Sequence, residues 1–214
     1  MKAFILAGSR ARGDWDERSD TDCVAFGDFS ESEIFEMSKG LKPPVNVIKY
    51  DANRFYDHYS EGSLFLHHCF TEGIFIGGDR RAWEERGAAF KVALSFRKEI
   101  ERYLDNIHLL RELDAFGGLF LPAYVLAYLG CKNCSIFFLA SNGRYQFNKN
   151  RSIIEAASFV GFSDGAVVSK VRNYYDWSVR GLGVSLPWEV TDRASAEIVI
   201  SKCVNFMETM SNEV

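Results

Sequence analysis

The sequence has few cysteines, no long apolar run and no excess of positive charge. Its cysteines are odd in number and scattered, which argues against a disulfide framework; they are Cys23, Cys69, Cys131, Cys134 and Cys203. No apolar segment reaches the roughly 20 residues of a membrane span, and the N-terminus lacks the charged region and cleavage site of a signal peptide. We therefore expect a cytoplasmic protein with no membrane partner.

Charge and composition indicate what kind of protein this is. The net charge of −4 gives no general attraction to nucleic acid, so a nucleic-acid partner would need a local basic patch. Hydrophobic residues make up 47% and charged residues 25%, which is typical of globular proteins. A chain of 214 residues has room for one large or two small domains. It shows no internal repeat and no low-complexity tract.

The most informative stretch is residues 4–26, FILAGSRARGDWDERSDTDCVAF. The continuous apolar run before Gly8 is typical of a strand that is buried on both faces. Gly8 and Ser9 then open a turn, which we call the Gly-Ser turn. Glycine lets backbone N–H groups approach an anion, the Ser9 hydroxyl adds a donor, and a following helix would present its N-terminal N–H groups. The pattern predicts a phosphate-binding turn.

Two aspartates stand just before a second apolar run. Asp20 and Asp22 precede Cys23-Val24-Ala25-Phe26, which predicts another buried strand. On a strand, residues i and i+2 share a face about 6.5 Å apart, so both carboxylates should point the same way. Mg²⁺ is usually held by one or two carboxylates together with substrate phosphates. The arrangement predicts a Mg²⁺ site for phosphoryl or nucleotidyl transfer.

These residues carry a specific resemblance. Gly8-Ser9, Ala11-Arg12-Gly13 and Ser19-Asp20-Thr21-Asp22 resemble the GSxARG…SDxD signature of the polymerase β-type nucleotidyltransferase superfamily. The spacing is that of its small, stand-alone prokaryotic members. The resemblance implies an α+β fold: a nucleotidyltransferase domain with a small mixed β-sheet over residues 1–90. An all-α helical domain over residues 91–214 would then bind substrate or acceptor.

The resemblance also implies a mechanism and roles. A hydroxyl acceptor would attack the α-phosphate of a nucleoside triphosphate, expected to be ATP, and release pyrophosphate. Asp20 and Asp22 would be catalytic and would hold Mg²⁺, while Gly8 and Ser9 would bind the β- and γ-phosphates. Arg12 would pair either with a phosphate or with an acidic neighbour, and the sequence leaves both open.

One position departs from the family pattern. The run Val45–Tyr50 predicts a third strand, and where the family carries a third carboxylate on this strand the chain has Asn46. An amide cannot accept the proton of the attacking hydroxyl. Asn46 is then an inactivating substitution or the native residue of a weakened or inactive relative. A third possibility, that Asp51 does the work, is disfavoured because Asp51 falls on the opposite face.

The remaining pattern is mostly helical. A capping box at residues 30–33 predicts a helix ending near Gly40, and Asp51 or Asn53 caps an expected helix through Glu72. A short strand is expected over residues 73–79, and further helices over 96–113, 123–129, 135–140, 152–160, 164–180 and 192–210.

Two further groups of residues could carry chemistry. In resembling enzymes the helical domain supplies a lysine or arginine to the triphosphate, and Lys149 and Arg151 are the candidates here. The pair Cys131 and Cys134 has no second ligand pair nearby, so we expect a reduced, structural role.

The resemblance leaves the acceptor open. It could be a small hydroxylated molecule, as in antibiotic-modifying relatives, or a protein or tRNA, as in nucleotidyltransferases of toxin–antitoxin pairs. The alternative of another class is a catalytically inactive nucleotide-binding module, which Asn46 favours. The oligomeric state is open as well.

Overall fold

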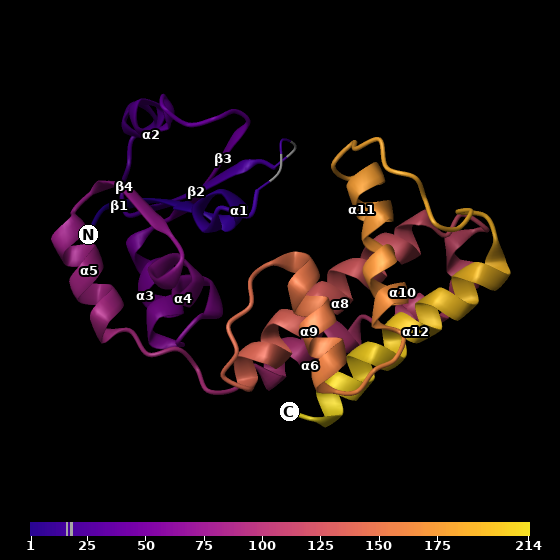
Figure 1. Ribbon diagram of the computed structural model, residues 1–214. Coiled ribbons are helices and arrows are strands. Elements are labelled where there is room, and N and C mark those ends of the chain that lie inside the picture. The colour runs from indigo at the N-terminus through magenta and orange to yellow at the C-terminus, as the bar shows by residue number, and fades with distance from the viewer. Residues whose placement is uncertain (16, 18) are drawn as a thin grey trace. The chain divides into compact units, whose positions relative to one another are not determined.

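The computed structural model describes residues 1–15, 17 and 19–214, with all of their side chains except that of His108. The chain divides into two compact units, Met1–Ala93 and Leu94–Val214. Every strand described lies in the first unit, and the second unit is helical (Figure 1). The expected α+β fold, with a small mixed sheet followed by a helical region, is confirmed.

The first unit is built on a four-stranded sheet with the order β3-β2-β1-β4. The strands are β1 (Ala3–Ala7), β2 (Thr21–Phe26), β3 (Val45–Tyr50) and β4 (Ile74–Gly78). β1 is antiparallel to both β2 and β4, and β2 is parallel to β3. The central strand β1 is buried on both faces, as its continuous apolar run predicts.

Helices cover both faces of this sheet. They are α1 (Gly8–Arg12), α2 (Glu31–Ser38), α3 (Ala52–Ser60), α4 (Leu64–Thr71) and α5 (Arg80–Ala89). On one face Phe26 packs with Phe55 of α3 and Trp83 of α5. On the other face, where α2 lies (Figure 1), the side chains of Phe4 and Cys23 pack with Ile34. The predicted capping box at the start of α2 is present, with Ser30 and Glu33 bonded reciprocally.

The second unit consists of helices around one core. They are α6 (Arg97–Asp105), α7 (His108–Arg111), the 3₁₀ turn η1 (Leu113–Phe116), α8 (Leu121–Ser141), α9 (Lys149–Phe159), α10 (Gly165–Lys170), α11 (Arg172–Ser178) and α12 (Arg193–Asn212). α8 packs against α6, α9, α11 and α12 and is the central helix of this unit.

Several expected helices are divided in the structure. The helix expected to run through Glu72 ends at Ser60, because Gly62 is buried at φ +67° and the chain turns there before α4 begins. The expected helix over 96–113 is divided into α6 and α7, with η1 following. The helix expected over 164–180 is divided into α10 and α11.

α8 corrects two expectations. The two helical pieces expected over 123–129 and 135–140 form one helix of 21 residues. By length and composition alone α8 could cross a membrane, so the expectation that no segment reaches that length is wrong. Within the second unit, however, α8 is mostly buried by its neighbouring helices, as the central helix of a folded unit is.

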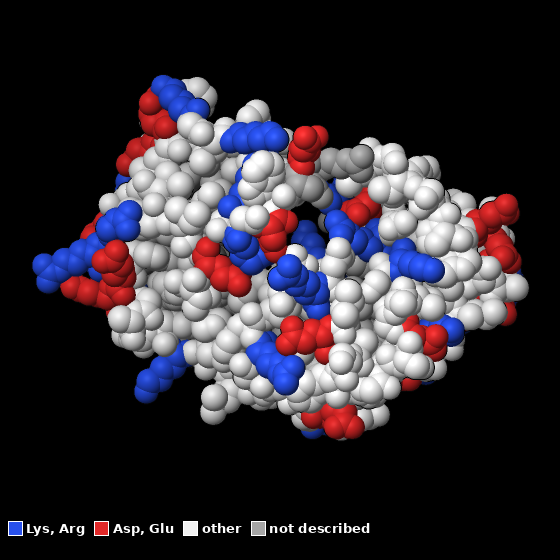
Figure 2. Space-filling view, in the orientation of Figure 1, with Lys and Arg blue, Asp and Glu red and all other residues white. Residues whose placement is uncertain are grey.

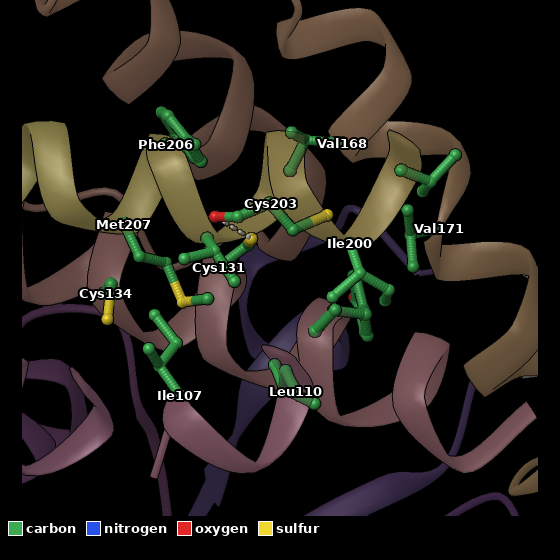
Figure 3. Close-up of a cluster of buried hydrophobic side chains, with 14 of the residues drawn as sticks. Ile107, Leu110, Cys131, Cys134, Val168, Val171, Ile200, Cys203, Phe206 and Met207 are labelled. Carbon is green, nitrogen blue, oxygen red and sulfur yellow. Dashed lines mark hydrogen bonds between the residues drawn. The ribbon is translucent and has the colours of Figure 1, made fainter. Parts of the chain in front are cut away.

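The cysteines of the second unit belong to its core. Cys131 and Cys134 of α8 lie beside Cys203 and Met207 of α12 in Figure 3. The thiol of Cys131 donates to the carbonyl oxygen of Cys203 at 3.6 Å, and all cysteines are free and buried. Burial raises the pKa of the Cys134 thiol to about 12, so it stays protonated and unreactive. This agrees with a reduced, structural role.

Candidate functional site

The Gly-Ser turn lies directly against a carboxylate on the neighbouring strand. Ala7, the last residue of β1, is paired with Asp22 of β2. Gly8 follows at φ +69°, and a Cβ atom built on it would lie 3.1 Å from Oδ2 of Asp22. Glycine adopts this backbone conformation without strain, and a side chain here would displace the Asp22 carboxylate. The structure therefore brings the expected phosphate turn and the second aspartate into contact.

The two aspartates flank a buried threonine. Thr21 is fully buried, and its hydroxyl donates to the carbonyl oxygen of Lys42 at 2.5 Å. Asp20 and Asp22 on either side of it are exposed. This alternation is the one expected of an extended segment whose two acidic side chains share its open face.

Arg10 organises the backbone in front of the aspartates. Its Nη2 donates to the carbonyl oxygen of Ser19 at 2.7 Å and its Nε to that of Asp20 at 3.2 Å. The guanidinium also lies 4.8 Å from the ring centre of Trp15. Arg10 thus ties α1 to the segment that carries Asp20. Sequence reasoning missed this role, since a lone arginine in the motif carries no sign of its partner.

Asn46 stands beside Asp22. In the parallel pairing of β2 and β3 the two residues are register partners, and both are exposed. Asp51 is instead the N-cap of α3, because its side chain accepts the N–H of Arg54 at 2.8 Å. Among these residues it is therefore the amide of Asn46, and not Asp51, that lies next to Asp22.

Arg12 is engaged with acidic neighbours. Its Nε donates to Oδ2 of Asp14 at 3.1 Å, and its Nη1 lies 3.6 Å from Oε2 of Glu72. Of the two partners that the sequence left open, the structure shows the acidic one. The N–H of Gly8 is engaged as well, since it donates to Nε2 of His68 at 3.4 Å. Sequence reasoning gave neither His68 nor Glu72 a part in the site.

The acidic side chains present fit a magnesium ion whose remaining coordination positions are filled by substrate and water. Among the described residues there is no group of three or more His, Cys, Asp or Glu side chains placed to bind a metal. Asp20 and Asp22 offer two carboxylates on an open edge, with the Gly-Ser turn beside Asp22. Mg²⁺ is commonly held by one or two carboxylates, waters and phosphate oxygens, so two protein ligands are sufficient.

The expected basic residues of the second unit lie at the start of α9. Lys149 and Arg151 are exposed and sit in the first turn of this helix, which Asn148 caps by accepting the N–H groups of Asn150 and Arg151. The sequence predicted the helix to start later, at Ser152, and so placed both residues in a loop.

One lysine of the second unit lies within the central helix α8. Lys132 is half-buried and is the single charged residue of α8. Burial, with the positive charge of Lys149 nearby, lowers the pKa of Lys132 to about 8.

Charged side chains of both signs are interspersed on the face shown in Figure 2. On α5, for example, Arg81 pairs with Glu85 at 2.8 Å, and Arg80 lies 3.5 Å from Glu84. Exposed pairs of this kind stabilise a protein by at most about 1 kcal/mol. They keep the surface mixed in sign, in keeping with the small net charge.

A small mixed sheet that presents a Gly-Ser turn next to acidic residues on the adjacent strand is the framework of proteins that transfer nucleotides. The nucleotidyltransferase domain family matches residues 2–114, just over half of the chain, and the chain belongs to this family. The match agrees with the resemblance to the polymerase β-type superfamily. No curated protein and no solved structure matched the chain.

Proposed function

We propose that this protein transfers a nucleoside monophosphate from a nucleoside triphosphate, with ATP as the expected donor, to a hydroxyl group of an acceptor. Its membership of the nucleotidyltransferase family supports transfer of a nucleotide in general. The observation that carries the finer proposal is the contact between the Gly-Ser turn and the Asp22 carboxylate, which would put a polyphosphate and an acidic metal ligand side by side.

The proposed reaction is an in-line displacement. The acceptor oxygen forms a bond to the α-phosphorus, and the bond from that phosphorus to the oxygen bridging to the β-phosphate breaks. Pyrophosphate leaves with the bonding electron pair. Asp20 and Asp22 would hold Mg²⁺, which would neutralise charge on the phosphate oxygens. Ser9 would donate its hydroxyl to the terminal phosphates.

Asn46 would limit the rate of this reaction. The hydroxyl proton must leave as the new bond forms, and a positioned general base typically accelerates such a step by about 10²–10⁴-fold. The amide of Asn46, next to Asp22, cannot take that proton. The proton would pass to water, and transfer would be correspondingly slow.

The family resemblance implies that the helical domain supplies a lysine or arginine to the triphosphate. Lys149 and Arg151, both exposed in the first turn of α9, would be the candidates.

The acceptor in this proposal is a small hydroxylated molecule, a protein or a tRNA. Asn46 also favours a second function, that of an inactive module that binds the nucleotide without transferring it. In that case the first unit would bind Mg²⁺ and nucleotide as tightly as an active enzyme of the family, and it would release no pyrophosphate.

One experiment separates the two functions. The wild-type protein, Asn46→Asp and Asp22→Ala are incubated with α-labelled ATP, Mg²⁺ and cell extract as the source of acceptors, and label transfer is followed with time. We expect transfer by Asn46→Asp to be about 10²-fold faster than by the wild type, because the new carboxylate can act as base. Asp22→Ala should transfer no label and lose Mg²⁺-dependent ATP binding in calorimetry.

The outcomes are distinct. Binding of ATP without transfer by both the wild type and Asn46→Asp would favour the inactive module. Undiminished Mg²⁺-dependent ATP affinity in Asp22→Ala would refute the assignment of Asp22.

A further inference from the structure

His68 of α4 contacts the Gly-Ser turn from within the first unit. α4 packs against β1, the strand that leads into the turn. Nε2 of His68 accepts the backbone N–H of Gly8 at 3.4 Å, although the two residues are 60 positions apart in the chain. The first N–H of α1 is therefore satisfied by a side chain of the same unit.

The other ring nitrogen, Nδ1, lies near Glu72, which in turn lies near Arg12. Nδ1 of His68 lies 3.0 Å from Oε2 of Glu72, and the same oxygen lies 3.6 Å from Nη1 of Arg12. Gly8 and Arg12 are the first and last residues of α1. His68 and Glu72 thus hold both ends of α1 against one element, α4 and its C-terminal cap.

The ring must be neutral to accept the N–H of Gly8 at Nε2; between Nδ1 and Glu72 the structure shows an ion-pair distance and no hydrogen bond. A lone pair on Nε2 is needed to accept the N–H of Gly8, so the ring proton belongs on Nδ1, facing Glu72. The side chain of His68 is only 12% exposed. Burial first, and then the positive charge of Arg12 and the neighbouring His67, lower the pKa of His68 to about 4, so the ring is neutral at pH 7.

We propose that His68 is a positioning residue of the nucleotide site: by holding the Gly8 N–H, it fixes the Gly-Ser turn against Asp22. The inference rests on the proposed function, since the turn is the proposed phosphate ligand. Gly8 is then constrained from two sides, by the Asp22 carboxylate at its Cα and by His68 at its nitrogen. Its own N–H is used for positioning, and Ser9 is left to bind phosphate.

The first test measures Mg²⁺-dependent ATP affinity of the full-length protein by calorimetry, which needs no catalytic turnover. His68→Phe removes the acceptor and leaves a ring of similar shape, so the turn loses its anchor, and we expect affinity to fall at least tenfold. His68→Gln keeps an acceptor oxygen near the position of Nε2 and should restore affinity to within about threefold. His67→Phe, one residue away, is the matched control and should bind like the wild type.

The second test reads the tautomer directly. ¹⁵N NMR of the imidazole of His68 should show the proton on Nδ1, and the amide proton of Gly8 should exchange faster in His68→Phe than in His67→Phe. These measurements require no ligand, so they remain decisive if the protein binds no nucleotide and the proposed function fails.

Three results would overturn the inference. They are a ring proton on Nε2, full ATP affinity in a folded His68→Phe protein, and equal loss of affinity in His68→Phe and His68→Gln.

Discussion

Gly8 has a left-handed backbone conformation and lies close to the Asp22 carboxylate. Its φ of +69° lies in the left-handed region, and an added Cβ would lie 3.1 Å from Oδ2 and 3.7 Å from Cβ of Asp22. Gly13, which ends the same short helix at φ +76°, has nothing within 4 Å of an added Cβ. The two glycines share the backbone requirement and differ in what a side chain would displace.

This difference gives a prediction for Gly8→Ala and Gly13→Ala. Both should destabilise the protein by about 1–2 kcal/mol, because alanine disfavours a left-handed backbone. Only Gly8→Ala should also push the Asp22 carboxylate away and lower Mg²⁺-dependent ATP affinity, by at least tenfold. Chemical denaturation and calorimetry measure the two effects. Equal ATP affinity in the two variants would show that the contact with Asp22 is irrelevant to binding.

At the scale of single residues, local sequence reveals only part of the site. The strands and the turn that place Gly8, Asp22 and Asn46 near one another could be predicted, because strand alternation and turn chemistry act over a few residues. The contact between His68 and Gly8 joins residues that lie 60 positions apart in the chain. A histidine in an apolar helix carries no sign of which backbone N–H it will meet.

At the scale of elements, helix starts were easier to predict than helix continuity. Asp51 and Asp192 cap the helices that begin after them, through bonds to N–H groups two or three residues away. By contrast, the Gly130 region resembles a helix break, yet α8 runs through it. A Cβ on Gly130 would lie 2.8 Å from Sδ of Met207 in α12. The glycine there serves the packing of two helices, which no local rule reports.

Gly165 is a second glycine of this kind. It is buried at the start of α10, and an added Cβ would lie 2.7 Å from the Cβ of Ala157 in α9. We expect Gly165→Ala to destabilise the protein by about 1–3 kcal/mol, because neither Cβ atom can rotate away and the helices must separate. Urea denaturation measures the loss.

Gly183→Ala is the matched control in the same unit. Gly183 has no left-handed backbone angle, and nothing lies within 4 Å of an added Cβ. This change should be neutral or stabilise the protein by up to about 1 kcal/mol, since it restricts only the unfolded chain. A Gly165→Ala protein as stable as Gly183→Ala would mean that α9 and α10 are less closely packed than the structure shows.

At the scale of the whole molecule, the boundary between the two compact units does not coincide with the end of the family match. The compact units meet between Ala93 and Leu94, whereas the family match ends at residue 114 and so includes α6, α7 and the start of η1. Yet Ile100, Ile107 and Leu110 are buried in the core that α8 and α12 form. The packing assigns these segments to the helical unit, although the family match extends over them.

This assignment can be tested with two fragments, 94–214 and 115–214. We expect 94–214 to fold alone, because its core is formed from its own residues. The residues at the start of this fragment are also hydrogen-bonded to the rest of it. The N–H of Phe96 donates to Oγ of Ser141 at 2.9 Å, and Nη1 of Arg97 donates to the carbonyl oxygen of Val214 at 2.9 Å.

The shorter fragment lacks α6 and α7 and would expose the apolar surface that they cover, which costs about 25 cal/mol for each Å². Far-UV circular dichroism should show a cooperative thermal transition for 94–214 and a broad one, or none, for 115–214. Equal cooperativity in both fragments would place the boundary at the end of the family match, because α6 and α7 would then be dispensable to the helical core.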